Sequence, residues 1–139
     1  MIPSLDNQQE YELFIYSIPT LYPQVEKSTL VFIRLGRYLA KITGEISFKA
    51  DIRSKILQVV DFGRSEILRY SYTVFRDQEE IYWYDPQPHP HISALASTHP
   101  HHKHVPPDLK HNRVPAPGLS FTQPNLPFLI QEIINNLLS

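Results

Sequence analysis

The stretch Tyr38-Leu39-Ala40-Lys41-Ile42-Thr43-Gly44-Glu45-Ile46-Ser47-Phe48-Lys49 alternates apolar and polar side chains over about twelve residues. A period of two is typical of a β-strand with one buried face. The apolar side chains on that face are Tyr38, Ala40, Ile42, Ile46 and Phe48. Gly44 interrupts the alternation, which predicts a bulge or a close approach of another backbone.

Further strands are expected between residues 29 and 85. The apolar or alternating segments are 29–35, 54–62, 67–75 and 80–85. The connections between them are short, whereas a parallel crossover needs a dozen or more residues, so we expect antiparallel hairpins.

An amphipathic helix is expected at each end of the chain. The first covers about residues 5–18, is capped by Ser4 or Asp6 and ends before Pro19. The second covers about residues 125–138, with Asn125 as its N-cap. The sequence therefore predicts an α+β fold, with both helices packed on one face of an antiparallel sheet of four to six strands.

The composition of the chain excludes several classes of protein. The chain has 139 residues, which suggests one domain over residues 1–139. A net charge of −1 argues against a broad basic surface, and the absence of cysteine excludes disulfides and thiol nucleophiles. The longest apolar run, residues 30–33, is too short to span a membrane, and no signal peptide is recognisable. We therefore expect a cytoplasmic protein that does not bind membranes.

Histidine and proline are concentrated in one segment. All seven histidines lie between His89 and His111, and ten of the thirteen prolines lie between Pro86 and Pro127. Proline disfavours helix interiors and central strands, so we expect residues 86–123 to form a long loop. Loops of this length tend to be functional or disordered.

The histidine cluster suggests general acid–base cleavage of RNA. Imidazole is present in both protonation states near neutral pH, so two histidines could act as base and acid around an attacking 2′-hydroxyl. A lysine could bind the phosphate, and an aspartate could orient one imidazole. The candidate catalytic residues are Asp85, His89, His101, His102, Lys103 and His104.

Other interpretations remain open. The histidines and Asp85 could bind zinc or nickel, or the segment could be a solvated loop that binds such ions adventitiously. Arg69 could bind a phosphate, and Tyr70 and Tyr72 could stack on bases. The alternative for these residues is that Arg69 is merely solvated and that the tyrosines belong to the core.

Several of these motifs resemble the TumE family of toxin–antitoxin toxins. They are Tyr70-Ser71-Tyr72, an aromatic strand ending at Tyr84-Asp85, then Pro88-His89, and Pro100-His101-His102-Lys103-His104. The matching positions are Tyr70, Tyr72, Asp85, His89, His101, His102, Lys103 and His104. The chain departs from the family pattern at Pro86 and Pro90, which replace an asparagine and a histidine.

The resemblance implies a toxin that is held inactive by a DNA-binding antitoxin and that acts as a ribonuclease on RNA. Within that function, a metal-independent mechanism without a cofactor is favoured over a metal-dependent nuclease. The alternative from another class is a non-catalytic binding module whose histidine-rich loop docks a partner or a metal. The chain could also assemble as a homodimer.

Overall fold

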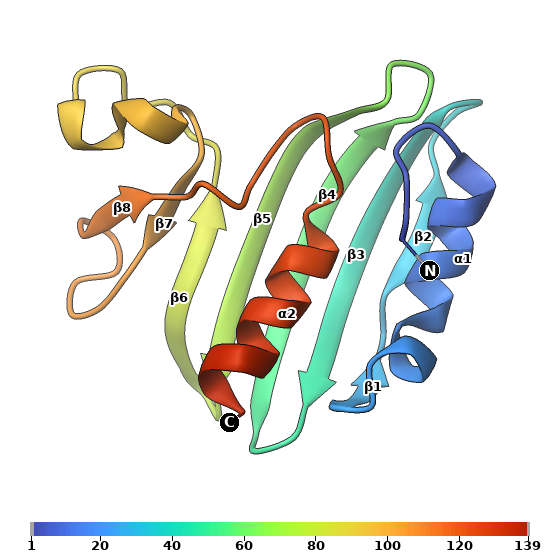
Figure 1. The fold of residues 1–139 in the computed structure, drawn as a ribbon, viewed down its shortest axis with the longest axis horizontal. Coiled ribbons are helices and arrows are strands. Elements are labelled where there is room, and N and C mark those ends of the chain that lie inside the picture. The colour runs from blue at the N-terminus through green and yellow to red at the C-terminus, as the bar shows by residue number, and fades with distance from the viewer. Residues whose placement is uncertain (1, 139) are drawn as a thin grey trace.

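The alternating stretch forms β3 (Leu39–Phe48), a long strand inside an eight-stranded antiparallel sheet (Figure 1). This computed structural model describes residues 2–138; residues 1 and 139, the two ends of the expected domain, lie outside the described part. The strand order is β1-β3-β4-β5-β6-β7-β8, and β2 pairs with β3 beside β1. The other strands are β1 (Val25–Ser28), β2 (Val31–Arg34), β4 (Ile52–Asp61), β5 (Glu66–Arg76), β6 (Glu79–Asp85), β7 (His102–His104) and β8 (Arg113–Pro115).

Gly44 marks the point where β1 gives way to β2 along one edge of β3. β1 pairs with Ile46–Phe48, whereas β2 pairs with residues 40–43. Gly44 has a φ of 137°, and a Cβ there would lie 2.5 Å from the Thr29 carbonyl oxygen. The close backbone approach expected from the sequence is confirmed.

The expected number of strands, four to six, was too low. β1 is four residues long, and β7 and β8 have three residues each, so none shows a recognisable alternation. β7 and β8, together with the 3-10 helix η1 (Ser93–Thr98), lie inside residues 86–123, where no regular element was expected. Such short strands are stabilised by pairing with neighbouring strands, which a local sequence pattern does not reveal.

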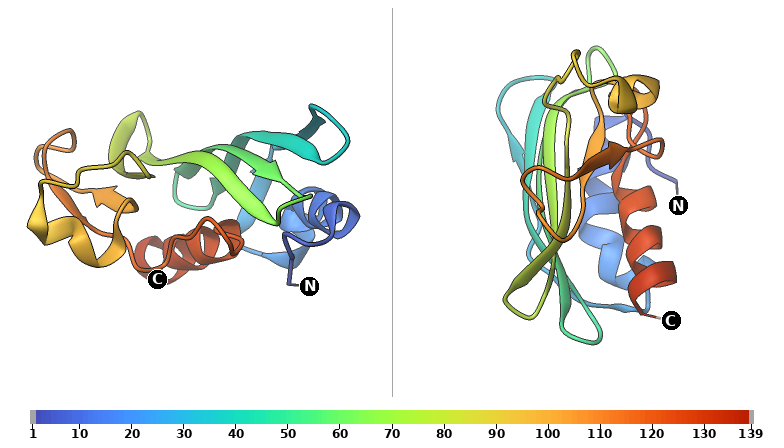
Figure 2. Two further views of the ribbon diagram at one scale, coloured as in Figure 1. Left: turned by 90° about the horizontal axis from the view of Figure 1, so that it is seen from above. Right: turned by 90° about the vertical axis from the view of Figure 1, so that its left-hand side faces the viewer.

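Helices α1 (Gln8–Leu21) and α2 (Leu126–Leu137) both lie on one face of the sheet (Figure 2). The cap of α1 is Asn7, whose side chain accepts a hydrogen bond from the Glu10 backbone N–H at 3.0 Å, rather than Ser4 or Asp6. Pro19 does not end α1: the helix continues to Leu21 and lacks the one hydrogen bond that an N–H at position 19 would donate to the Ile15 carbonyl. Within the described residues, no helix is long and apolar enough to cross a membrane.

A buried chain of hydrogen bonds links the two helices through the sheet. Gln58 on β4 donates its side-chain amide to the Tyr11 hydroxyl of α1 and accepts from the Tyr72 hydroxyl of β5 at 2.6 Å. Asn125 donates to Tyr72 at 3.2 Å and also binds the backbone of Ser120, so its side chain does not cap α2. Each buried polar group in this chain has a partner, which fixes the helices on β4 and β5.

Replacing Gly44 by alanine is expected to lower the free energy of unfolding by about 1–3 kcal/mol, because the new Cβ would meet the Thr29 carbonyl in a strained backbone conformation. Gly36→Ala is the matched control, since its Cβ would meet nothing closer than 4.0 Å. Urea unfolding of both variants measures the difference. Equal stability of the two variants would show that the passage from β1 to β2 beside β3 does not require glycine at position 44.

Candidate functional site

The pairing of β6 with β7 sorts the histidine segment onto two faces of the sheet. Asp85 lies opposite His102, and Trp83 lies opposite His104. Successive side chains of a strand point to opposite faces, so these four side chains share one face. Tyr84 and Lys103, which also lie opposite each other, point to the other face, where α2 packs.

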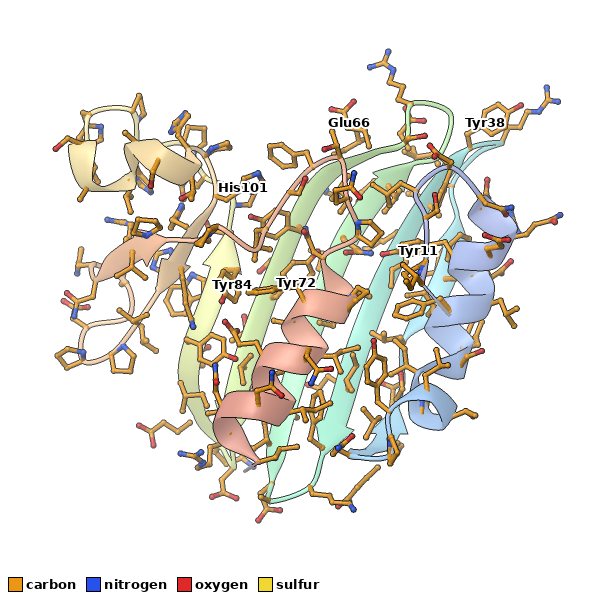
Figure 3. All side chains as sticks on the ribbon, in the orientation of Figure 1. Tyr11, Tyr38, Glu66, Tyr72, Tyr84 and His101 are labelled. Carbon is orange, nitrogen blue, oxygen red and sulfur yellow. The ribbon has the colours of Figure 1, made fainter. Side chains whose placement is uncertain are left out.

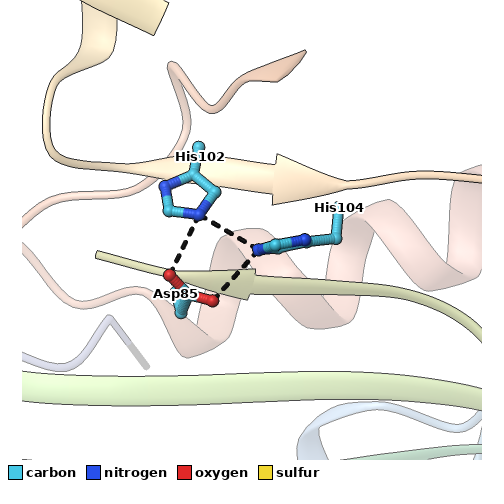
Figure 4. Close-up of side chains that lie close together, drawn as sticks. All are labelled: Asp85, His102 and His104. Atoms are coloured by element: carbon cyan, nitrogen blue, oxygen red, sulfur yellow. Dashed lines mark hydrogen bonds and ion pairs between the residues drawn. The ribbon is translucent and has the colours of Figure 1, made fainter. Parts of the chain in front are cut away.

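Asp85, His102 and His104 form a compact centre (Figure 4). The Asp85 Oδ1 atom lies 3.0 Å from His102 Nε2, and its Oδ2 atom lies 3.1 Å from His104 Nε2. The two Nε2 atoms are 3.1 Å apart. Among residues 2–138, this is the group of histidine and acidic side chains whose donor atoms are close enough to share a metal ion.

The backbone fixes the orientation of both imidazoles. His102 Nδ1 lies 3.1 Å from the Pro100 carbonyl oxygen, and His104 Nδ1 lies 2.6 Å from the Leu109 carbonyl oxygen. A carbonyl only accepts, so Nδ1 of each ring donates to it, and Nε2 is turned toward Asp85. Both nitrogens of each ring are therefore engaged inside the protein.

Asp85 is held from two further directions. Its carboxylate accepts hydrogen bonds from the Gln87 backbone N–H at 2.9 Å and from the Trp83 indole at 3.2 Å. The Trp83 ring stacks on His104 with centroids 4.3 Å apart. Trp83 thus positions both the carboxylate and one imidazole, a role that the sequence analysis did not foresee.

The centre is largely shielded from water. His102 is 1% exposed and His104 5%, whereas the Asp85 side chain is 23% exposed. Burial lowers the pKa of His102, an effect that the Pro100 carbonyl and Asp85 offset in part. Neutral imidazole is consequently the favoured form of His102 at neutral pH.

His89 and Arg113 lie at the rim of the centre. The His89 ring packs edge-on against His102 with centroids 5.0 Å apart, and its nitrogens have no hydrogen bond within residues 2–138. Partial burial and the nearby charge of Arg113 lower the pKa of His89. Arg113 lies opposite His104 across β7 and β8, and its buried Nε has no partner in the described part of the chain. Arg113 was missed because its strand was not expected.

Lys103 is separated from the centre by the sheet. Its Nζ lies 3.4 Å from Glu132 Oε2 on α2 and 4.1 Å from the centroid of the Tyr82 ring. Tyr84 donates its hydroxyl to the same Glu132 oxygen at 2.6 Å. This arrangement does not support the expected phosphate contact of Lys103 beside His102, because alternation along β7 sends the two side chains to opposite faces.

His101 and Tyr72 also lie on the helix-facing side (Figure 3), and the Tyr70 ring stacks on both. The His101 Nδ1 atom is 2.7 Å from the Tyr70 hydroxyl, and the two rings stack. Tyr72 is 0% exposed and Tyr70 4%, so neither ring offers a free face for a base. Arg69 differs: it is exposed on the face of β5 that is turned away from α2, the face that carries Trp83 and Asp85.

Comparison with known proteins adds one finding. The family model described as Toxin TumE matches residues 16–137. No curated protein and no solved structure matches the chain.

In chelator-treated protein at neutral pH, we expect His102 and His104 to carry their proton on Nδ1, because each Nδ1 faces a backbone carbonyl. Long-range ¹H–¹⁵N correlation spectra distinguish the two tautomers. His91, which is exposed and makes no ring hydrogen bond among residues 2–138, is the reference and should exchange between them. A fixed proton on Nε2 of both rings would contradict this geometry.

Proposed function

Because the chain belongs to the TumE toxin family, we propose that it is the toxin of a toxin–antitoxin pair and that it cleaves RNA at the Asp85–His102–His104 centre. The observation that carries this proposal is the concentration of reactive groups on one face. A carboxylate bridges two buried imidazoles. A third histidine and Arg113, whose buried Nε has no partner among residues 2–138, lie at the rim. Perturbed, clustered titratable groups are typical of reaction sites.

His89 is the best placed group for proton transfer. Its nitrogens are free of hydrogen bonds in the described part of the chain, and its lowered pKa favours the neutral form that accepts a proton. His102 and His104 have no free ring nitrogen, so they serve the reaction as part of a fixed centre with Asp85. His101 lies on the other face and is bound to Tyr70.

The proposed reaction uses the 2′-hydroxyl of the substrate. His89 takes the hydroxyl proton, the 2′-oxygen bonds to phosphorus, and the bond from phosphorus to the 5′-oxygen breaks. Water supplies a proton to the departing oxygen, and the hydroxide that remains takes the proton from His89. The products are a 2′,3′-cyclic phosphate and a 5′-hydroxyl. Arg113 would bind the phosphate, since guanidinium matches phosphate oxygens in geometry and charge.

The partners in this proposal are RNA and an antitoxin. RNA is the substrate because DNA lacks the attacking hydroxyl. The antitoxin would be a DNA-binding protein that holds the chain inactive in the cytoplasm. Arg69, exposed on the same face as Asp85, is positioned to contact RNA beyond the cleaved bond.

Growth after induced expression and RNA cleavage by purified protein test the proposal. We expect His89→Ala and Arg113→Gln each to reduce the cleavage rate by about 100-fold or more, because the first removes the base and the second removes the phosphate contact. Both variants should relieve growth arrest, and the products of the native protein should carry cyclic phosphate ends.

The matched control is His111→Ala, which removes an exposed histidine of the same segment whose side chain pairs with Asp108. Circular dichroism establishes that each variant folds. Unchanged cleavage in folded His89→Ala and Arg113→Gln would place the reaction elsewhere, and growth arrest without RNA cleavage would favour a binding module.

A further inference from the structure

We propose that Asp85, His102 and His104 bind one divalent transition-metal ion of the zinc type. The inference deepens the proposed function, on which its catalytic meaning rests, but metal binding itself can be measured without RNA. Three independent features of the centre support it: the spacing of the donor atoms, the orientation of the imidazoles and the chemistry of the ligand set.

The donor atoms have the spacing of a coordination shell. The three distances that join Nε2 of His102, Nε2 of His104 and the two Asp85 oxygens are 3.0–3.1 Å. Two ligand atoms about 2.05 Å from a zinc ion at the tetrahedral angle lie about 3.3 Å apart. Each imidazole faces a different Asp85 oxygen, so an ion between the two Nε2 atoms would have both carboxylate oxygens beside it.

The imidazoles are oriented as metal ligands are. Histidines that bind metals donate their other ring N–H to a carbonyl or carboxylate, and here Nδ1 of both rings faces a backbone carbonyl. With Nδ1 of both rings donating to the backbone, the two Nε2 atoms and the Asp85 carboxylate face one another. A cation bound between them would be attracted by all three ligands.

The ligand set selects the class of ion. Magnesium and calcium prefer oxygen ligands, and the chain has no cysteine for sites that depend on thiolate. Two imidazoles and one carboxylate suit zinc and its neighbours, and three protein ligands are typical of catalytic sites, which leave a position for water or substrate. The partly exposed Asp85 side chain marks the open side.

An ion there would lie on the face that carries Arg113 and His89. It could bind a phosphate oxygen as a Lewis acid and stabilise the charge that develops during cleavage. The centre would then combine with Arg113 in neutralising the phosphate, while His89 stays free for proton transfer.

Calorimetric titration of chelator-treated full-length protein with zinc tests the inference. We expect one tight site per chain and a rise in the melting temperature on zinc addition, because the ion binds the folded state. His104→Gln and the isosteric Asp85→Asn should each weaken that site by at least about 100-fold. His111→Ala, which alters the exposed His111–Asp108 pair, should leave it unchanged.

The outcomes separate this inference from the proposed function. Zinc affinity that is equal in native protein and folded His104→Gln and Asp85→Asn, or only weak binding that His111→Ala reduces, would overturn the metal site. Tight zinc binding without RNA cleavage would support the metal site and overturn the ribonuclease. Full RNA cleavage by protein that takes up no zinc would support the ribonuclease and overturn the metal site.

Discussion

The pairing of β7 with β6 is the constraint on which the candidate site depends. It sets Asp85 opposite His102 and Trp83 opposite His104, across three paired positions. A shift of one residue would turn His102 and His104 toward α2 and bring Lys103 to the position beside Asp85, because side chains alternate along a strand. The register therefore determines which of the clustered basic residues share a face with the carboxylate.

The two faces of this sheet edge have different roles. On the helix-facing side, Glu132 of α2 accepts from the Tyr84 hydroxyl and pairs with Lys103, which ties β6 and β7 to the core. The chain of hydrogen bonds from Tyr11 to Asn125 extends that fixed layer across β4 and β5. The opposite face is turned away from α1 and α2 (Figure 2). By the alternation of side chains along β6 and β7, it carries the Asp85–His102–His104 centre. A rigid support on one face is what a precisely oriented site on the other requires.

The sequence predicted the elements whose pattern is local. The alternation along β3, the helical spacing of α1 and α2 and the close approach at Gly44 all follow from neighbours in the chain. It also placed Asp85, His102 and His104 in one candidate cluster. The sequence did not show that Lys103 points away from this cluster, or that Arg113 lies beside it. Both placements depend on the pairing of β7 with β6 and of β8 with β7, which three-residue strands do not reveal by their own pattern. The sequence also did not decide whether the tyrosines bind bases or belong to the core, because Tyr72 shows the same alternation in either case.

Strand pairing assembles Asp85, His102 and His104 into one centre, and the proposed metal ion would be bound there. Diffraction recorded at the zinc absorption edge, from crystals of the protein equilibrated with zinc, shows where the ion binds. We expect one strong anomalous peak about 2.0–2.2 Å from Nε2 of both histidines and from an Asp85 oxygen. A peak bound instead by exposed histidines such as His91 or His111, with the centre closed around a shared proton, would contradict it.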